Sequence, residues 1–212
     1  MDTAAHHDDT QVFINTQVFD DGPPLIVYLR PVLELTDDQF FELCQINRDL
    51  RIERTAQGEL VIMPPTGWKT SERNAEITMQ LRIWAKHDDT GAVTDSSGGF
   101  KLPNGADRSP DAAWIRHERL ATLTPEQKEK FLPLCPDFVI ELRSPTDSLT
   151  LLLSKMQEYR ENGAQLGWLI DPIQRRVYVY HPQRPIEILE NPETISGDPV
   201  LPGFTLDLRE IW

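Results

Sequence analysis

Two acidic residues stand in segments that otherwise have the pattern of buried β-strands. In residues 137–143, DFVIELR, the two-residue period of a strand places Asp137, Glu141 and Arg143 on one face. A carboxylate in a central apolar strand costs several kcal/mol unless an opposite charge or a metal ion compensates it. Glu141 therefore indicates either a salt bridge, to Arg143 or to another basic residue, or a metal ligand.

Asp111 is the second acid, and it opens the segment DAAWI directly after Pro110. An aspartate in that place is commonly a turn or capping residue. A site for a hard divalent cation needs at least two converging oxygen ligands on rigid elements, and Asp111 together with Glu141 would provide them. The pair is therefore a candidate metal site.

Two polar residues lie on or beside the apolar face of a helix predicted for residues 148–162, which follows the Glu141 strand. Lys155 stands at the edge of that face, from which its stem could turn inward; a solvated lysine paired with Glu158 is the alternative. Tyr159 follows one turn later and is by default a core aromatic with its hydroxyl at the rim.

Asn74 and Ser71 lie about one turn apart near the start of a helix predicted for residues 70–88. Asn74 is on the inward side of this helix, where a polar side chain is unexpected, so the helix start could face the site. An amide satisfied by backbone groups is the alternative explanation.

Hydrophobic periodicity predicts the elements that would position these residues. Thr36 and Gln39 form a capping box before a first helix, a Gln57-Gly58 turn joins a hairpin, and Gly163 ends the helix of residues 148–162. Strands around a crossing helix, followed by a closing hairpin, predict an α/β (α+β) fold with a mixed β-sheet flanked by helices. Further strands are expected at 92–95, 100–102, 111–115, 137–143, 166–171, 177–181 and 186–189, with a helical patch at 126–131 and a turn-rich loop at 102–110.

The chain of 212 residues carries a formal net charge of −13, with a sequence pI of about 4.8. That charge opposes diffuse attraction to nucleic-acid phosphates, although a bound metal ion would supply local positive charge. Part of the excess lies in residues 1–21, which hold five aspartates and no Lys or Arg. We expect residues 1–30 to form an acidic extension, poorly ordered or packed at an edge, and residues 31–212 to form one domain.

The sequence gives no sign of a membrane or secretory segment. No stretch approaches the roughly 18 consecutive apolar residues of a membrane helix, and the first ten residues lack the features of a signal peptide. Cys44 and Cys135 are far apart and have no CxxC partner, so neither a zinc site nor a disulfide framework is indicated. These features predict a cytoplasmic protein.

Several runs resemble the Uma-two family of restriction-type endonucleases, a branch of the PD-(D/E)XK nuclease superfamily. They are SPDAAWI, the run from Pro136 to Pro172, PPTGWKTSERNAEI and the closing LPGFTLDLREIW, and together they span roughly residues 35–212. The resemblance implies a restriction-endonuclease-like fold and a DNA endonuclease that uses Mg²⁺ or Mn²⁺. It also implies a symmetric homodimer, because duplex cleavage needs one active site for each strand.

The same resemblance assigns roles to individual residues. Asp111 and Glu141 would hold the metal ion together with the backbone carbonyl of Leu142. The superfamily's lysine usually stands two residues after the second acid, where this chain has Arg143, a side chain that cannot easily deprotonate. The resemblance therefore implies that Lys155, on the following helix, positions the attacking water.

Three alternatives stay open. Asp137, which also follows a proline, is a rival metal ligand ranked below Asp111. The chain could instead be a nuclease-like fold that serves as a binding or assembly module without cleaving, which the acidic charge and the absence of lysine at position 143 favour. A glycosidase-type acid pair of Asp111 and Glu141 is chemically sufficient, but the tryptophans that a sugar site would expose fall in predicted cores. An arginine clamped between Asp111 and Glu141 would contradict a metal site.

Overall fold

The computed structural model describes residues 24–212, so the predicted acidic extension of residues 1–30 falls largely outside the described residues. Within its last part, strand β1 (Leu25–Val27) pairs with β3 (Leu60–Met63) at the edge of a sheet. The domain boundary at residue 30 stays a prediction. None of the described helices is both long enough and apolar enough to cross a bilayer.

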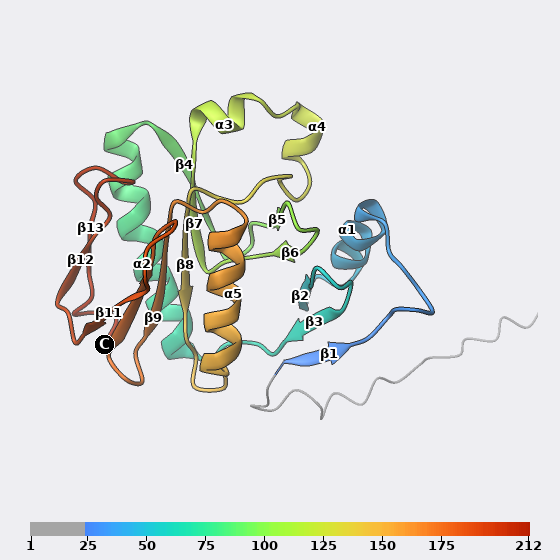
Figure 1. Cartoon of the computed structure of the whole chain (residues 1–212), viewed down its shortest axis with the longest axis horizontal. Coiled ribbons are helices and arrows are strands. Elements are labelled where there is room, and N and C mark those ends of the chain that lie inside the picture. Colours follow the sequence, from blue (N-terminus) through green and yellow to red (C-terminus); the bar gives the residue numbers. More distant parts are fainter. Residues whose placement is uncertain (1–23) are drawn as a thin grey trace, which may run out of the picture.

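A six-stranded sheet forms the centre of the fold (Figure 1). Its strand order is β11-β10-β9-β8-β7-β4, and the central pair β8-β9 is parallel while the other pairs are antiparallel. Every residue of β8 and β9 is buried, as their continuous apolar runs predict. The strands are β4 (Gly91–Asp95), β7 (Ala112–Arg116), β8 (Phe138–Leu142), β9 (Leu166–Asp171), β10 (Arg176–Tyr180) and β11 (Glu187–Glu190).

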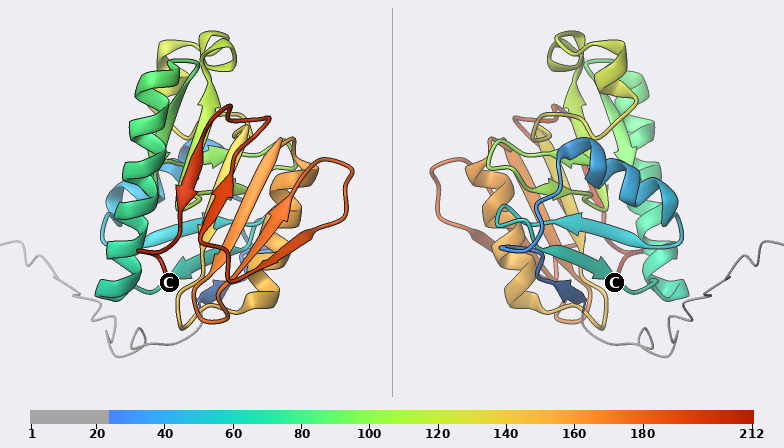
Figure 2. Two further views of the ribbon diagram at one scale, coloured as in Figure 1. Left: turned by 90° about the vertical axis from the view of Figure 1, so that its left-hand side faces the viewer. Right: turned by 90° about the vertical axis from the view of Figure 1, so that its right-hand side faces the viewer.

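Different elements cover the two faces of this sheet (Figure 2). Helix α2 and the β12-β13 hairpin pack on one face, and helix α5 packs on the other. The bounds are α2 (Trp68–Asp88), α5 (Leu149–Glu161), β12 (Thr194–Ser196) and β13 (Thr205–Asp207).

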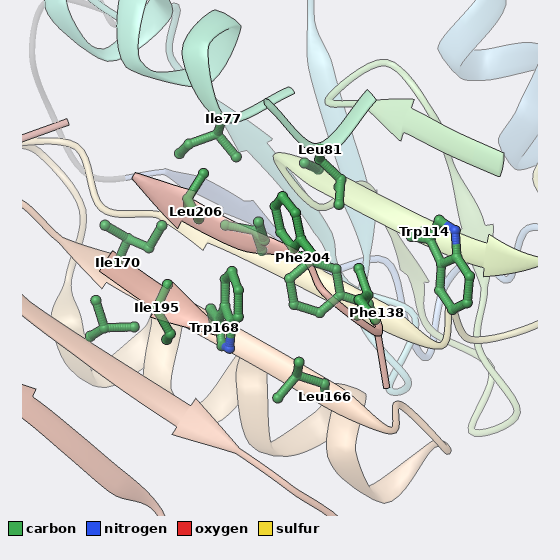
Figure 3. Packing of buried hydrophobic residues seen from close by; sticks show 14 of the residues in the cluster. Ile77, Leu81, Trp114, Phe138, Leu166, Trp168, Ile170, Ile195, Phe204 and Leu206 are labelled. Atoms are coloured by element: carbon green, nitrogen blue, oxygen red, sulfur yellow. The ribbon is translucent and has the colours of Figure 1, made fainter. Parts of the chain in front are cut away.

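Alternation along β8 divides the core between these two faces. Phe138 and Ile140 belong to the hydrophobic cluster under α2, whereas Val139 belongs to the cluster under α5. On the α2 side, Phe138 meets Trp168 edge to face at 4.7 Å between ring centroids, and Phe204 stacks on Trp168 at 5.9 Å (Figure 3). Burial of these large rings fixes the register of β8, and the register determines where Glu141 points.

A second, smaller sheet lies beside α5, at the right in Figure 1. Its order is β1-β3-β2-β6-β5, and helix α1 packs on it through the buried Phe40, Ile52 and Leu60. α1 begins with the predicted capping box, in which Thr36 and Gln39 exchange side-chain to backbone hydrogen bonds. The remaining bounds are α1 (Asp37–Ile46), β2 (Arg51–Arg54), β5 (Phe100–Lys101) and β6 (Asp107–Arg108).

The predicted fold class, a mixed β-sheet flanked by helices, is confirmed. The hairpin, the two long helices and the strands of the six-stranded sheet lie where periodicity placed them, within about two residues at each end. Residues 102–110 were expected to be a loop but contain β6, and the β12-β13 hairpin and α3 (His117–Ala121) were not predicted. The helical patch expected at 126–131 is the shorter α4 (Pro125–Lys128). These elements are too short to show a hydrophobic period.

Candidate active site

Glu141 lies near the end of β8 and points toward α5, where two polar side chains meet it. Its Oε1 accepts a hydrogen bond from the hydroxyl of Tyr159 at 3.0 Å and lies 2.8 Å from the Nζ of Lys155. The lysine stem has turned inward, and its side chain is 12% exposed. Arg143, the other basic partner considered from sequence, pairs instead with Asp171 at 2.8 Å. Glu141 is therefore compensated by Lys155.

A second buried glutamate, Glu53 on β2, shares the same lysine. Its Oε1 lies 2.8 Å from the Nζ of Lys155, and its Oε2 lies 3.2 Å from Arg108 Nη1. The backbone N–H of Ser109 also donates to Glu53, at 3.0 Å. Lys155 thus connects the small sheet to the six-stranded sheet. Sequence reasoning missed Glu53, although alternation in the run RIER places Arg51 and Glu53 on one strand face.

Asp111 lies just before β7 and faces the end of β8. Ala112 on β7 pairs with Ile140 on β8, and the two strands are antiparallel. Continuing this register by one residue places Asp111 opposite Glu141. Asp111 Oδ2 accepts a hydrogen bond from the backbone N–H of Leu142 at 2.8 Å. The two acids singled out from the sequence are therefore neighbours across the β7-β8 pair.

The other oxygen of Asp111 is held by side chains from β2 and α2. Its Oδ1 lies 3.1 Å from Arg51 Nη1 and 3.4 Å from Asn74 Nδ2. Asn74 therefore faces Asp111, while Ser71 exchanges a hydroxyl hydrogen bond with Thr66 at 3.2 Å. Among the described residues Arg51 is hydrogen-bonded to Asp111 and not to Glu141, although its charge also acts on Glu141 and lowers the pKa of that acid.

Asp137 lies apart from this group, although it shares a strand face with Glu141. It accepts a hydrogen bond from the backbone N–H of Arg116 at 3.0 Å and pairs with Arg119 at 3.1 Å. Asp137 stands four positions before Glu141 along the strand, a distance of about 13 Å between their Cα atoms. The structure thus pairs Asp137 with surface arginines at the opposite end of β8.

Burial and mutual charge shift the pKa values of these groups strongly. Burial raises the pKa of Glu141 to about 7, although Lys155 opposes the shift, and nearby Asp111 adds to it. Burial acts on Glu53 in the same direction, but Lys155 and Arg108 outweigh it and hold the pKa of Glu53 at about 2. Shifts of this kind in a cleft are characteristic of functional sites.

The acids line a cleft of about 850 Å³ between the small sheet, the end of β8 and the start of α5. Its inner wall carries the acids and cations described above, and its rim carries apolar side chains such as Trp68 and Leu151, which are 80% and 51% exposed. A shallower depression of about 480 Å³ on the α2 side is lined by Ser71 and Asn74, among others, and Asp111 lines both hollows. Asp111, which is 6% exposed, therefore lies between the two hollows.

The donor atoms of this site fit Mg²⁺ or Mn²⁺. Within residues 24–212 there is no cluster of three or more His, Cys, Asp or Glu side chains arranged to hold a metal ion. Mg²⁺, however, is usually held by one or two carboxylates and takes its other ligands from water and substrate phosphates. Asp111 and Glu141 offer two hard oxygen donors at one end of the β7-β8 pair, and Leu142 lines the same cleft.

Replacing Tyr159 by Phe is expected to lower the free energy of unfolding by about 1–2 kcal/mol, because a buried carboxylate loses a donor while Lys155 remains. Urea denaturation in EDTA measures this value. Tyr180→Phe is the matched control: within residues 24–212 the Tyr180 hydroxyl reaches only Leu153 O, at 3.5 Å, so its loss is expected to cost less than about 0.5 kcal/mol. Equal costs for the two variants would show that the bond to Glu141 adds no stability.

The fold and the cleft define a restriction-endonuclease-like α+β protein with buried acids and a buried lysine at one end of its central sheet. A family model named Uma2 and described as "Putative restriction endonuclease" matches residues 37–209, and the chain belongs to this family. A crystal structure of a "putative nuclease belonging to DUF820" from Anabaena variabilis superposes with a TM-score of 0.69, at 21% identity, covering 84% of this chain and 97% of that one. This likeness supports the fold. The comparison with curated proteins found no match.

Proposed function

We propose that the protein is a Mg²⁺- or Mn²⁺-dependent DNA endonuclease of the PD-(D/E)XK type, hydrolysing phosphodiester bonds in the cleft described above. The observation that carries the proposal is the position of Asp111 opposite Glu141, with Lys155 on Glu141, in an open cleft of about 850 Å³. Membership of a family of nucleases supports the same reaction class.

Asp111, Glu141 and the backbone carbonyl of Leu142 would hold the cation. A bound Mg²⁺ would stabilise the charge that develops on the phosphate during hydrolysis. Lys155 has three N–H donors, of which two face Glu53 and Glu141. The third donor is available to orient a water molecule toward the phosphorus atom. In this arrangement Glu53 holds Lys155 in place.

Cleavage of duplex DNA would require a symmetric homodimer with one site for each strand. The net charge of −13 means that the cation and the site itself would have to supply most of the attraction for phosphate. We place the protein in the cytoplasm.

A second candidate is a binding or assembly module that has lost cleavage. Arg143 at the usual lysine position favours it, because that side chain is engaged with Asp171 and not with the acid pair. The two candidates differ in one respect: cleavage requires a divalent cation at Asp111 and Glu141, whereas a binding module has no need of one.

The test is incubation of plasmid, single-stranded DNA and RNA with Mg²⁺ or Mn²⁺, and with EDTA, for the wild type and Asp111→Asn. We expect cleavage of at least one DNA substrate that EDTA stops and that falls about 10³-fold or more in the variant, which corresponds to roughly 4 kcal/mol of lost transition-state stabilisation. Cleavage that survives EDTA or the variant would contradict the proposal. Metal-independent DNA binding without cleavage would favour the second candidate.

A further inference from the structure

Arg51 occupies the side of Asp111 that a metal ion would need. Asp111 Oδ2 accepts a hydrogen bond from the backbone N–H of Leu142, so Oδ1 is the oxygen that can exchange its partner for a cation. Arg51 Nη1 lies 3.1 Å from Oδ1, and Arg51 Nη2 donates to the backbone carbonyl of Ser109. A cation that binds Oδ1 would therefore compete with Arg51.

The charges in direct contact at this site are almost balanced. When all four carboxylates, those of Glu53, Asp111, Glu141 and Glu158, are ionised, their three cationic partners Arg51, Arg108 and Lys155 leave a net charge of −1. A divalent cation would change this to +1, and one phosphodiester group would return it to zero. Metal and phosphate are therefore expected to bind better together than alone.

Of the three cations, Arg51 is the least firmly held. Arg108 and Lys155 each contact two carboxylates, whereas Arg51 contacts one carboxylate and one carbonyl. Its Nε is buried and has no hydrogen-bond partner among residues 24–212, although its side chain is 29% exposed and lines the cleft. An unpaired guanidinium N–H beside a cleft can donate a hydrogen bond to a ligand that binds in the cleft.

We propose that Arg51 is the phosphate-binding residue of this site: it neutralises Asp111 when no ligand is bound, and it transfers to the scissile phosphate when a divalent cation takes Asp111 Oδ1. This proposal rests on the proposed function. Only the side chain needs to move, because β2 pairs Arg51 with Met63 in the small sheet. The guanidinium fork matches two phosphate oxygens, so the transfer exchanges one anionic partner for another. Cation and phosphodiester then bind cooperatively.

The test measures binding of Mn²⁺ by calorimetry, alone and with a phosphorothioate-linked oligothymidylate that slows cleavage. In the wild type the oligonucleotide is expected to tighten Mn²⁺ binding by about tenfold or more. In Arg51→Met, Mn²⁺ alone is expected to bind about tenfold more tightly, because its competitor is gone, while the oligonucleotide effect falls below about threefold. A methylphosphonate oligonucleotide, which lacks the charge, should give no coupling.

Arg82→Met is the matched control, since Arg82 lines the shallower depression that Asp111 also lines but has no ion pair within residues 24–212. It should behave as the wild type. If Arg51→Met does not fold by thermal melting, Arg51→Lys takes its place: it should keep the wild-type affinity for Mn²⁺ alone and lose most of the coupling, because a single ammonium group lacks the fork.

The outcomes separate this inference from the proposed function. Wild-type Mn²⁺ binding that depends on Glu141, with unchanged affinity and coupling in Arg51→Met, would overturn the role of Arg51 and leave the metal site in place. Absence of Mn²⁺ binding at millimolar concentration in both proteins would overturn the metal site and the role of Arg51 with it.

Discussion

Replacement of Glu141 by Gln is expected to abolish metal-dependent cleavage, with a loss of about 10³-fold or more in kcat/KM, while the protein stays folded. The amide keeps the shape of the side chain and can still accept from the Tyr159 hydroxyl, but it removes one of the two charges that would hold the cation. Plasmid nicking in Mg²⁺, with calorimetric titration of Mn²⁺, measures both consequences.

The stability of the same variant separates a metal ligand from a purely structural ion pair. Lys155 keeps Glu53 as a partner, and a buried carboxylate with a pKa of about 7 is removed, so we expect the free energy of unfolding in EDTA to change by less than about 2 kcal/mol. A much larger loss would indicate that Glu141 serves mainly as a salt-bridge partner. Glu158→Gln is the control, because Glu158 lines the same cleft and pairs with Arg108, away from the acid pair. Its activity should fall less than tenfold.

The sequence predicted those parts of the site that lie on strongly patterned elements. The apolar run of β8 fixes Glu141 on the face toward α5, and the helical period of α5 places Lys155 and Tyr159 on the side that meets it. The proximity of Asp111 to Glu141 followed from the resemblance, not from periodicity, because strand order cannot be derived from a two-residue period.

The parts that sequence reasoning missed depend on contacts between the two sheets. Glu53 meets Lys155 across 102 residues of chain, and Arg51 meets Asp111 across 60. β2 has only four residues, three of them charged, and such a sequence is as typical of a solvated edge strand as of a buried one. Only the packing of the small sheet against α5 and β8 reveals that Glu53 is buried, at 3% exposure. The one sequence feature that could have revealed Glu53 was Lys155, because a buried lysine needs carboxylate partners. From the sequence alone, however, a solvated Lys155 was an equally open possibility.

Lys155→Met is expected to have the largest effect on stability, a loss of about 3–5 kcal/mol, together with loss of cleavage. Glu53 and Glu141 share this lysine at 2.8 Å each, and removal of one partner from a buried ion pair leaves an uncompensated charge. Met fills a similar volume, so a cavity does not explain the loss. Urea denaturation in EDTA at pH 8 measures it, and Lys130→Met, which removes a lysine paired with the exposed Asp38, is the control with an expected cost below about 1 kcal/mol.

The pH dependence of this loss follows from the same charges. Lys155 lowers the pKa of both buried acids, so its removal raises their folded-state pKa values relative to the wild type, and the pKa of Glu141, already about 7, rises further. Groups with raised folded pKa values favour the fold at low pH and lose that contribution as pH rises through the folded pKa. The destabilisation of Lys155→Met relative to the wild type should therefore shrink as pH falls from 8 toward 5. A loss independent of pH would indicate that packing, not charge, explains it.

A double replacement decides which acid depends more on Lys155. Of the two acids, Glu53 has the lower pKa, about 2, and therefore depends more on its positive neighbours. Adding Glu53→Gln to Lys155→Met should therefore recover more stability than adding Glu141→Gln. Glu141, with a pKa of about 7, can take up a proton near neutral pH and tolerate the loss of Lys155 more easily. The opposite order would mean that Arg108 and Arg51 alone suffice for Glu53, in which case Lys155 is held in the cleft chiefly by Glu141.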